Sequence, residues 1–118
     1  MKKFIILIPI FNDRESLTKL IEDINFEIKD LTSHISIIVV NDASSQQITD
    51  NYTNTENINS IEIINMKGNR GHARCIASGL KYIFKKKEFD FVIPMDGDGE
   101  DRPCLLYTSR AHETTSDL

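Results

Sequence analysis

The sequence of 118 residues is 40% hydrophobic and 27% charged, which is an ordinary composition for one globular domain. Its net charge of −4 and the lack of a basic block argue against nucleic acid as a partner. The two cysteines, Cys75 and Cys104, lie far apart without metal-type spacing, which argues against a disulfide and favours a reducing, cytoplasmic compartment.

The first predicted element is a strand over residues 3–10. Its apolar run does not alternate with polar residues, which predicts burial on both faces of a parallel sheet. Two lysines ahead of the run imitate a signal peptide, but Pro9 and Asn12 interrupt it and no cleavage site of small residues follows. No apolar run in this sequence has the length of a membrane span.

A helix is expected after this strand. Asn12 is the predicted N-cap, and Glu15 stands three residues on as its partner in a capping box. The residues predicted to form one apolar stripe on this helix are Leu17, Leu20, Ile21, Ile24, Ile28 and Leu31.

Two further strands are predicted over residues 35–40 and 61–66. The polar, asparagine-rich segment 46–59 between them is expected to form a short helix and then a loop. A second long helix is predicted over residues 72–87, followed by a fourth strand over 89–95. The predicted apolar stripe of that helix consists of Ala73, Ile76, Ala77, Leu80, Ile83 and Phe84.

Apolar strands that alternate with amphipathic helices predict an α/β fold, with a parallel sheet and right-handed crossovers. The carboxyl ends of parallel strands meet at one edge of the sheet, and ligands bind there in open α/β folds. The polar segments predicted at this edge are 9–13, 41–44, 69–74 and 95–98.

The last of these segments contains two aspartates separated by one glycine. Asp96 and Asp98 follow a predicted buried strand, and together they can present carboxylates to one hard cation, Mg²⁺ or Mn²⁺. The alternative is a polar turn, because aspartate and glycine are common turn residues.

The final 15 residues, 104–118, differ in composition from the rest of the chain. The first 103 residues contain 18 Ile, 9 Lys and 9 Asn, and the last 15 contain none of the three. This tail resembles the in-frame translation of a transposon-type sequencing adapter, so we exclude it from the fold prediction. Residues 1–103 are then expected to be the N-terminal part of a longer domain.

Together the four edge segments resemble the N-terminal half of the family 2 glycosyltransferases, over residues 6–103. The branch resembled most loads sugars onto polyprenyl or dolichyl phosphate. The resemblance implies the GT-A fold, of which this chain would be the truncated, Rossmann-like, nucleotide-binding half with flanking helices.

By this resemblance, Pro9, Phe11 and Asp13 line the nucleotide pocket. Phe11 stands for the usual tyrosine and loses its hydroxyl, and Asp13 stands for the usual glutamate. Two alternatives stay open, because Phe11 could be a core aromatic residue and Asp13 a helix-start residue.

Asp42 matches the aspartate that contacts the base or the ribose in this family, and the alternative is a turn aspartate. Ala43 replaces the usual glycine, which argues against a left-handed backbone at that position.

Asn69 and Arg74 match the helix start that lies beside the donor. Backbone amides there attract phosphate, and Arg70 or Arg74 can add a charge-assisted contact. His72 is more often structural or solvated than catalytic in such a position, since the sequence shows no partner for it.

The resemblance also implies roles for the two aspartates near the end of the chain. It makes Asp98 a ligand of Mg²⁺ or Mn²⁺ and places Asp96 against the ribose or the metal. The metal would stabilise the departing nucleoside diphosphate as a Lewis acid.

The function implied by the resemblance is inverting, metal-dependent transfer of a sugar from a UDP- or GDP-sugar. The acceptor it suggests is a polyprenyl phosphate. No catalytic residue is assigned, because the base used by other family members would lie beyond position 103. We therefore expect residues 1–103 alone to be inactive, and association with the cytoplasmic face of the membrane to need a missing C-terminal part.

Two other functions remain as alternatives. A nucleotidyltransferase normally has a glycine-rich phosphate loop after its first strand, and residues 9–13 do not form one. A non-enzymatic receiver-type signalling domain needs a phosphorylatable aspartate at the end of its third strand, and residues 65–67 contain none.

Overall fold

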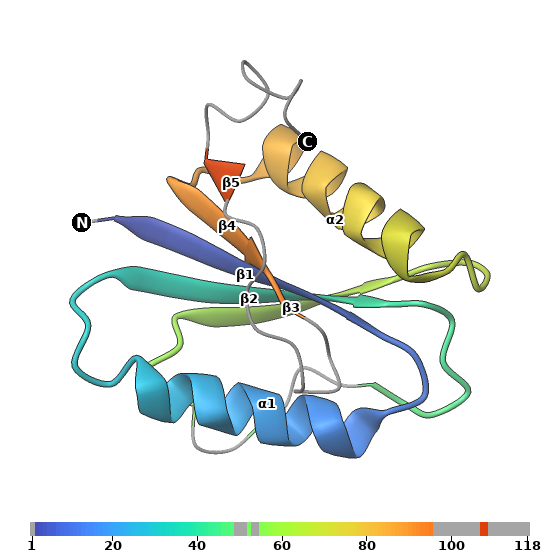
Figure 1. The fold of residues 1–118 in the computed structure, drawn as a ribbon, viewed down its shortest axis with the longest axis horizontal. Coiled ribbons are helices and arrows are strands. Elements are labelled where there is room, and N and C mark those ends of the chain that lie inside the picture. Colours follow the sequence, from blue (N-terminus) through green and yellow to red (C-terminus); the bar gives the residue numbers. More distant parts are fainter. Residues whose placement is uncertain (1, 49–51, 53–54, 96–106, 109–118) are drawn as a thin grey trace.

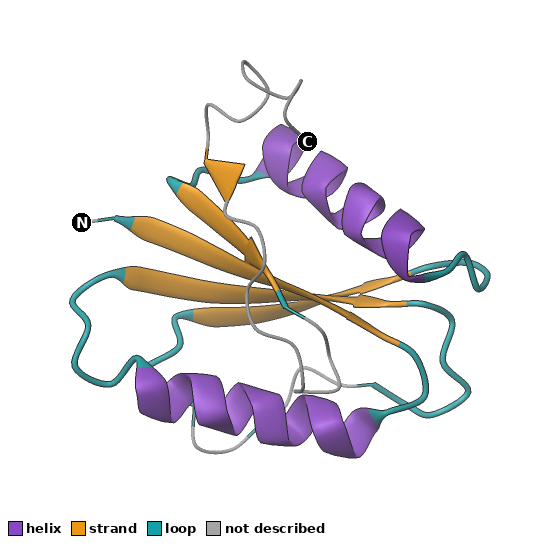
Figure 2. Ribbon diagram, in the orientation of Figure 1, coloured by secondary structure: helices purple, strands orange, loops and turns teal. Residues whose placement is uncertain are grey.

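A computed structural model describes residues 2–48, 52, 55–95 and 107–108. In chain order the elements are β1 (Lys3–Ile10), α1 (Arg14–Glu27), β2 (His34–Asn41), β3 (Ser60–Asn65), α2 (His72–Lys86), β4 (Phe91–Pro94) and β5 (Tyr107–Thr108). Figures 1 and 2 show a twisted sheet with α1 on one face and α2 on the other. The predicted α/β fold is therefore confirmed.

The strands lie in the order β3-β2-β1-β4-β5. β1 pairs with β2 and β4 in parallel, and β2 pairs with β3 in parallel. β5 pairs antiparallel with β4 and lies in the tail that the composition excludes from the fold. The sequence does not predict this strand, because a two-residue ladder at a sheet edge needs only backbone hydrogen bonds and no apolar pattern.

The continuous apolar run of β1 is explained by two separate cores. Because side chains alternate along a strand, Ile6 and Ile8 face α1 while Ile5 and Leu7 face α2. The side chains of β2 alternate between the two cores in the same way, with Val39 on the α1 side and Val40 on the α2 side. The predicted burial of these strands on both faces is confirmed.

Helix α1 begins one residue later than predicted. Its N-cap is Asp13, whose Oδ1 accepts a 3.3 Å hydrogen bond from the Ser16 amide, so the assignment of Asn12 as the cap was wrong. Asn12 has a φ of 50°, a conformation that asparagine tolerates better than most residues, and its side chain is engaged elsewhere.

The predicted apolar stripe of α1 is correct except at its end. Leu17, Ile21 and Ile24 are buried, and Leu20 and Ile28 pack against the same core. Leu31 lies beyond the end of the helix and is 56% exposed, so its place in the stripe was wrong.

The buried face of α2 is rotated from the predicted stripe. Cys75, Gly79 and Ile83 are buried, whereas three members of the predicted stripe, Ala73, Ala77 and Phe84, are exposed. The reason is Gly79, at which a Cβ atom would lie 2.5 Å from Cδ1 of Leu7. A helix can approach the sheet this closely only along a face that carries no side chain at the contact.

The short helix predicted within residues 46–59 is absent from the described part of that segment. Instead, Ile58 is buried and Ile48 and Tyr52 pack against the core on the α1 side. Asn57 donates from its amide to Oδ1 of Asn25 at 2.7 Å and from its side chain to the Asn25 carbonyl at 3.1 Å. These two hydrogen bonds tie the end of the segment to α1.

Candidate functional site

Three backbone hydrogen bonds hold the carboxyl ends of the strands together. The Asp42 amide donates to the Ile10 carbonyl at 2.9 Å, the Met66 amide to Asn41 at 2.8 Å, and the Met95 amide to Leu7 at 2.9 Å. The loops after β1, β2 and β3 therefore leave the sheet at one edge, which is also where α2 begins (Figure 1). We call this edge the carboxyl edge.

The loops after β1 and β2 are tied together by Asn12. Its Oδ1 accepts hydrogen bonds from the amides of Ser45 (2.7 Å) and Gln46 (3.2 Å) and from the Ser45 hydroxyl (3.1 Å). In return, the Asn12 amide donates to Oγ of Ser44 at 2.9 Å. Sequence reasoning missed this role, because the partners of Asn12 are 33 and 34 residues away in the sequence.

The three residues predicted to line the nucleotide pocket lie at this edge in different environments. Pro9 is buried in β1. Phe11 is 50% exposed, so the alternative of a core aromatic was wrong. The Asp13 carboxylate caps α1, as the helix-start alternative requires.

Asp42 is the most buried acidic residue of the described chain, with 4% of its surface exposed. Its Oδ1 accepts the Arg70 amide at 2.7 Å, and its Oδ2 accepts the Gly71 amide at 2.9 Å. Burial by itself raises the pKa of Asp42, but these two hydrogen bonds, a third from the Cys75 thiol and the charge of Arg70 outweigh it. The pKa consequently lies below its usual value, and the group is ionised at neutral pH.

The next residue, Ala43, has a φ of 60°. The expectation that alanine excludes a left-handed backbone here was therefore wrong. The surrounding bonds enforce the conformation, because the Ser44 amide donates to Oδ1 of Asn41 at 3.1 Å, and Nδ2 of Asn41 donates to Oδ1 of Asn65 at 2.9 Å.

The segment 69–74 follows β3 and opens α2. Gly71 is the N-cap, with φ 91° and ψ 162°, and the helix has no side-chain cap. Asn69 donates from Nδ2 to the Asp42 carbonyl at 3.5 Å, while the side chains of His72 and Arg74 are exposed. The structure thus brings Asn69 beside Asp42 and leaves Arg74 exposed to solvent.

Cys75 completes the surroundings of Asp42, and sequence reasoning did not find it. Burial, followed by the hydrogen bond to Asp42 and the charge of Asp42, raises the pKa of the Cys75 thiol to about 12. The thiol therefore stays protonated and acts as a donor to the carboxylate.

The predicted metal ligands, Asp96 and Asp98, lie outside the described residues. Within the described ranges there is no group of three or more His, Cys, Asp and Glu side chains that could hold a metal ion. β4 ends at Pro94, and the Met95 amide bonds to β1 just before the two aspartates. Two carboxylates are a donor set of the kind that Mg²⁺ or Mn²⁺ prefers.

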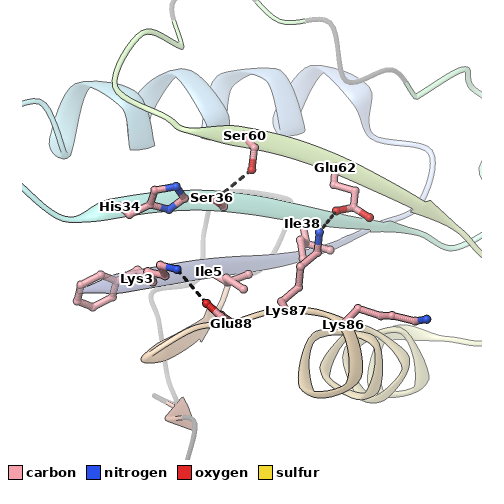
Figure 3. A pocket seen from close by; sticks show the side chains of 11 residues that line it. Lys3, Ile5, His34, Ser36, Ile38, Ser60, Glu62, Lys86, Lys87 and Glu88 are labelled. Atoms are coloured by element: carbon pink, nitrogen blue, oxygen red, sulfur yellow. Dashed lines mark hydrogen bonds and ion pairs between the residues drawn. The ribbon is translucent and has the colours of Figure 1, made fainter. Parts of the chain in front are cut away.

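A pocket of about 350 Å³ lies at the opposite edge, where the strands begin (Figure 3). It contains two ion pairs, Lys3 with Glu88 at 3.3 Å and Lys87 with Glu62 at 2.8 Å. None of the predicted site residues lines it.

Comparisons with known proteins agree on one family. The family model described as "Glycosyl transferase family 2" matches residues 5–108. The chain is 33% identical over 103 residues to "Undecaprenyl-phosphate 4-deoxy-4-formamido-L-arabinose transferase" of Yersinia pestis (strain Pestoides F), and equally to that of Yersinia pseudotuberculosis serotype O:3 (strain YPIII). These alignments cover 87% of this chain and 31% of each relative, so the chain spans about a third of their length.

Solved structures show the same fold. The structure of S. aureus TarS 1–349 has a TM-score of 0.62 at 19% identity and covers 99% of this chain and 32% of that one. The structure of S. aureus TarS 1–349 in complex with UDP has a TM-score of 0.59 at 21% identity and covers 83% of this chain and 28% of that one.

Proposed function

Since the chain belongs to glycosyl transferase family 2, whose model matches residues 5–108, we propose that it is the donor-binding part of a glycosyltransferase. The observation that carries the proposal is the meeting of the loops after β1, β2 and β3 at the carboxyl edge. Ligands of open α/β sheets bind outside this edge. Membership of this family favours a sugar-transfer function over the two alternatives, nucleotidyl transfer and receiver-type signalling.

The proposed donor is a UDP- or GDP-sugar. The residues we assign to its binding are Pro9, Phe11, Asp13, Asp42, Asn69, Arg74 and Asp96. The exposed ring of Phe11 supports a contact with an aromatic base, and the exposed side chain of Arg74 supports a charge-assisted contact with phosphate. A structural neighbour of the chain is a UDP complex, which agrees with this donor class.

The proposed metal ligands are Asp96 and Asp98. A bound Mg²⁺ or Mn²⁺ would supply Lewis-acid stabilisation of the leaving diphosphate. We assign no catalytic base within this chain.

The proposed acceptor is a polyprenyl phosphate, because the relatives in Yersinia are named for undecaprenyl phosphate. A phosphate acceptor is already anionic, so inverting attack on the sugar needs little help from a general base. Neither α1 nor α2, the helices of the described ranges, has the length and hydropathy of a membrane span. Contact with the cytoplasmic face of a membrane is part of this proposal.

The test is titration calorimetry of the chain with UDP, GDP and ADP in the presence of Mn²⁺. We expect UDP or GDP to bind at least about tenfold more tightly than ADP, because buried polar groups reject the wrong base. Equal binding of all three nucleotides, or of none, would contradict the proposal. For the full-length protein, transfer of labelled sugar to undecaprenyl phosphate tests the acceptor, and residues 1–103 should give no transfer.

A further inference from the structure

We infer that Asn41 is a positioning residue of the donor site: its side-chain amide holds the turn after β2, in which Asp42 lies. Asn41 is the last residue of β2, and 7% of its surface is exposed. The contacts that carry the inference lie within the chain and do not depend on the proposed function. The identity of the ligand does rest on that function.

The side chain of Asn41 connects the end of β3 with the turn after β2. Its Nδ2 donates to Oδ1 of Asn65, the last residue of β3, at 2.9 Å, and its Oδ1 accepts the Ser44 amide at 3.1 Å. A backbone amide can only donate, so the Ser44 amide must face the side-chain oxygen, which leaves the nitrogen for Asn65. The two hydrogen bonds therefore fix the orientation of the Asn41 side chain.

The hydrogen bond from Ser44 closes a turn that is unfavourable on its own. Ala43 lies inside this turn with a φ of 60°, a left-handed conformation that side chains with a Cβ atom disfavour. Without Oδ1 of Asn41 the Ser44 amide would lose this partner, and Ala43 could return to a conformation with negative φ. That change would redirect the chain directly after Asp42.

This turn connects two parts of the carboxyl edge that we assign to donor binding. Asp42 precedes Ala43, and its carboxylate accepts two backbone amides at the start of α2. Ser44 follows Ala43, and its Oγ accepts the Asn12 amide at 2.9 Å, next to Phe11. A shift of the turn would therefore displace Asp42 and the loop after β1 together.

Asn65 allows a test that spares the core, because its own side chain is exposed. Asn65→Asp keeps an oxygen for Nδ2 of Asn41, whereas Asn65→Leu has a similar size and removes it. We would measure the affinity for UDP or GDP, whichever binds the wild type more tightly, with Mn²⁺ in about 0.15 M salt, which screens the added charge. Asn65→Leu should weaken binding about threefold to tenfold, and Asn65→Asp should stay within about twofold of the wild type.

Two results of this experiment would overturn the inference. One is an Asn65→Leu variant that binds the nucleotide as tightly as the wild type. The other is equal weakening by both variants, because the oxygen that Asn41 uses would then not matter.

The part played by Ala43 is tested by a double-mutant cycle with Asn41→Ala. Glycine adopts a left-handed backbone readily, so Ala43→Gly makes the hydrogen bond from Ser44 less necessary. Asn41→Ala should weaken nucleotide binding about tenfold alone and about threefold or less in the Ala43→Gly background. The same loss in both backgrounds would show that Asn41 does not act through this turn.

The matched control removes another buried asparagine side chain. Asn25 is 5% exposed, and its Oδ1 accepts the Asn57 amide near the end of α1 and the start of β3, at the opposite edge of the sheet. Asn25→Ala should lower the midpoint of urea unfolding as Asn41→Ala does, but leave nucleotide affinity unchanged. An equal loss of affinity in Asn25→Ala would mean that lost stability, and not a displaced turn, explains the effect of Asn41→Ala.

A measurement without ligand separates the inference from the proposed function. In hydrogen exchange followed by NMR, the Ser44 amide should exchange about threefold to tenfold faster in Asn65→Leu than in the wild type, and at an unchanged rate in Asn65→Asp. If Ser44 exchanges equally in all three proteins, Asn41 does not hold the turn and the inference fails. If no nucleotide binds the wild type, the proposed function fails, and the exchange of Ser44 still decides the role of Asn41.

Discussion

Two residues at the carboxyl edge have a left-handed backbone although neither is glycine. Asparagine tolerates this conformation better than most residues, and the side chain of Asn12 is held by hydrogen bonds from the loop after β2. Ala43 has no such bond, and a left-handed conformation costs an alanine roughly 1–2 kcal/mol. The hydrogen bonds around Ala43 must offset this cost.

We therefore predict that Ala43→Gly leaves the free energy of unfolding unchanged or raises it by about 0.5 kcal/mol, because relief of the strain exceeds the entropy cost of glycine. The matched control is Ala77→Gly on the exposed face of α2, which should lower it by about 1 kcal/mol. Urea denaturation followed by circular dichroism measures both. Equal destabilisation by the two changes would contradict the argument.

There is a physical reason why only some residues of the site could be predicted from the sequence. Asp42 stood out because it follows a buried strand, but its partners are backbone amides 28 and 29 residues away, which no local pattern encodes. Cys75 was passed over because a cysteine in a helix has no polar signature. Its contact with Asp42 exists only once α2 packs on the sheet.

At the scale of the elements, Gly79 sets how closely α2 approaches the sheet. Gly79→Ala should lower the free energy of unfolding by about 1–3 kcal/mol, because the new methyl group would overlap the buried Leu7 and Val40 side chains. The gain in helix propensity, about 1 kcal/mol, would offset only part of this. Gly68→Ala is the control, since a Cβ there meets nothing within 4 Å and should change stability little.

The loops after β1 and β2 provide a second test at this scale. Asn12→Ala removes an oxygen that accepts from Ser45 and Gln46, and should lower the free energy of unfolding by about 1–2 kcal/mol. Asn12→Asp keeps an acceptor in place and should cost less. Chemical denaturation compares the two variants, and an equal loss would show that the side-chain oxygen does not tie the loops.

Most helices and strands were predictable because the buried strands and the helices leave clear and different patterns of apolar residues in the sequence. Burial on both faces makes β1 and β2 continuous apolar runs, and α1 repeats its apolar residues at helical spacing. The face of α2 was misjudged because the contact is made by a glycine, and hydrophobic patterns give no weight to an absent side chain. The short helix expected in segment 46–59 is absent from its described residues, among which Asn57 is bonded to Asn25 of α1.

For the whole molecule, the parallel pairing of β1 to β4 was predictable from the alternation of strands and helices, whereas the proposed metal site depends on residues outside the described ranges. If Asp98 ligates a metal, Asp98→Asn should weaken nucleotide binding in Mn²⁺ by about tenfold or more, and chelation by EDTA should do the same to the wild type. Asp30→Asn, an exposed carboxylate after α1, is the control. Binding that is indifferent to both treatments would exclude these metal ligands.

Glu62 has a consequence for the behaviour of the protein at high concentration. β3 is the terminal strand of the sheet order, and Glu62 interrupts its apolar sequence. The carboxylate accepts the Tyr82 hydroxyl and pairs with Lys87 at 2.8 Å, which keeps a charge in the middle of the strand. A charge there disfavours stacking of a second copy along the edge.

Glu62→Val would remove this charge and leave a segment of high β propensity. We expect light scattering to show concentration-dependent aggregation of that variant and none of the wild type. Equal scattering by both would mean that another part of the chain protects the edge. Aggregation of the variant alone would show that the ion pair on β3 serves solubility, a role separate from the ligand site at the carboxyl edge.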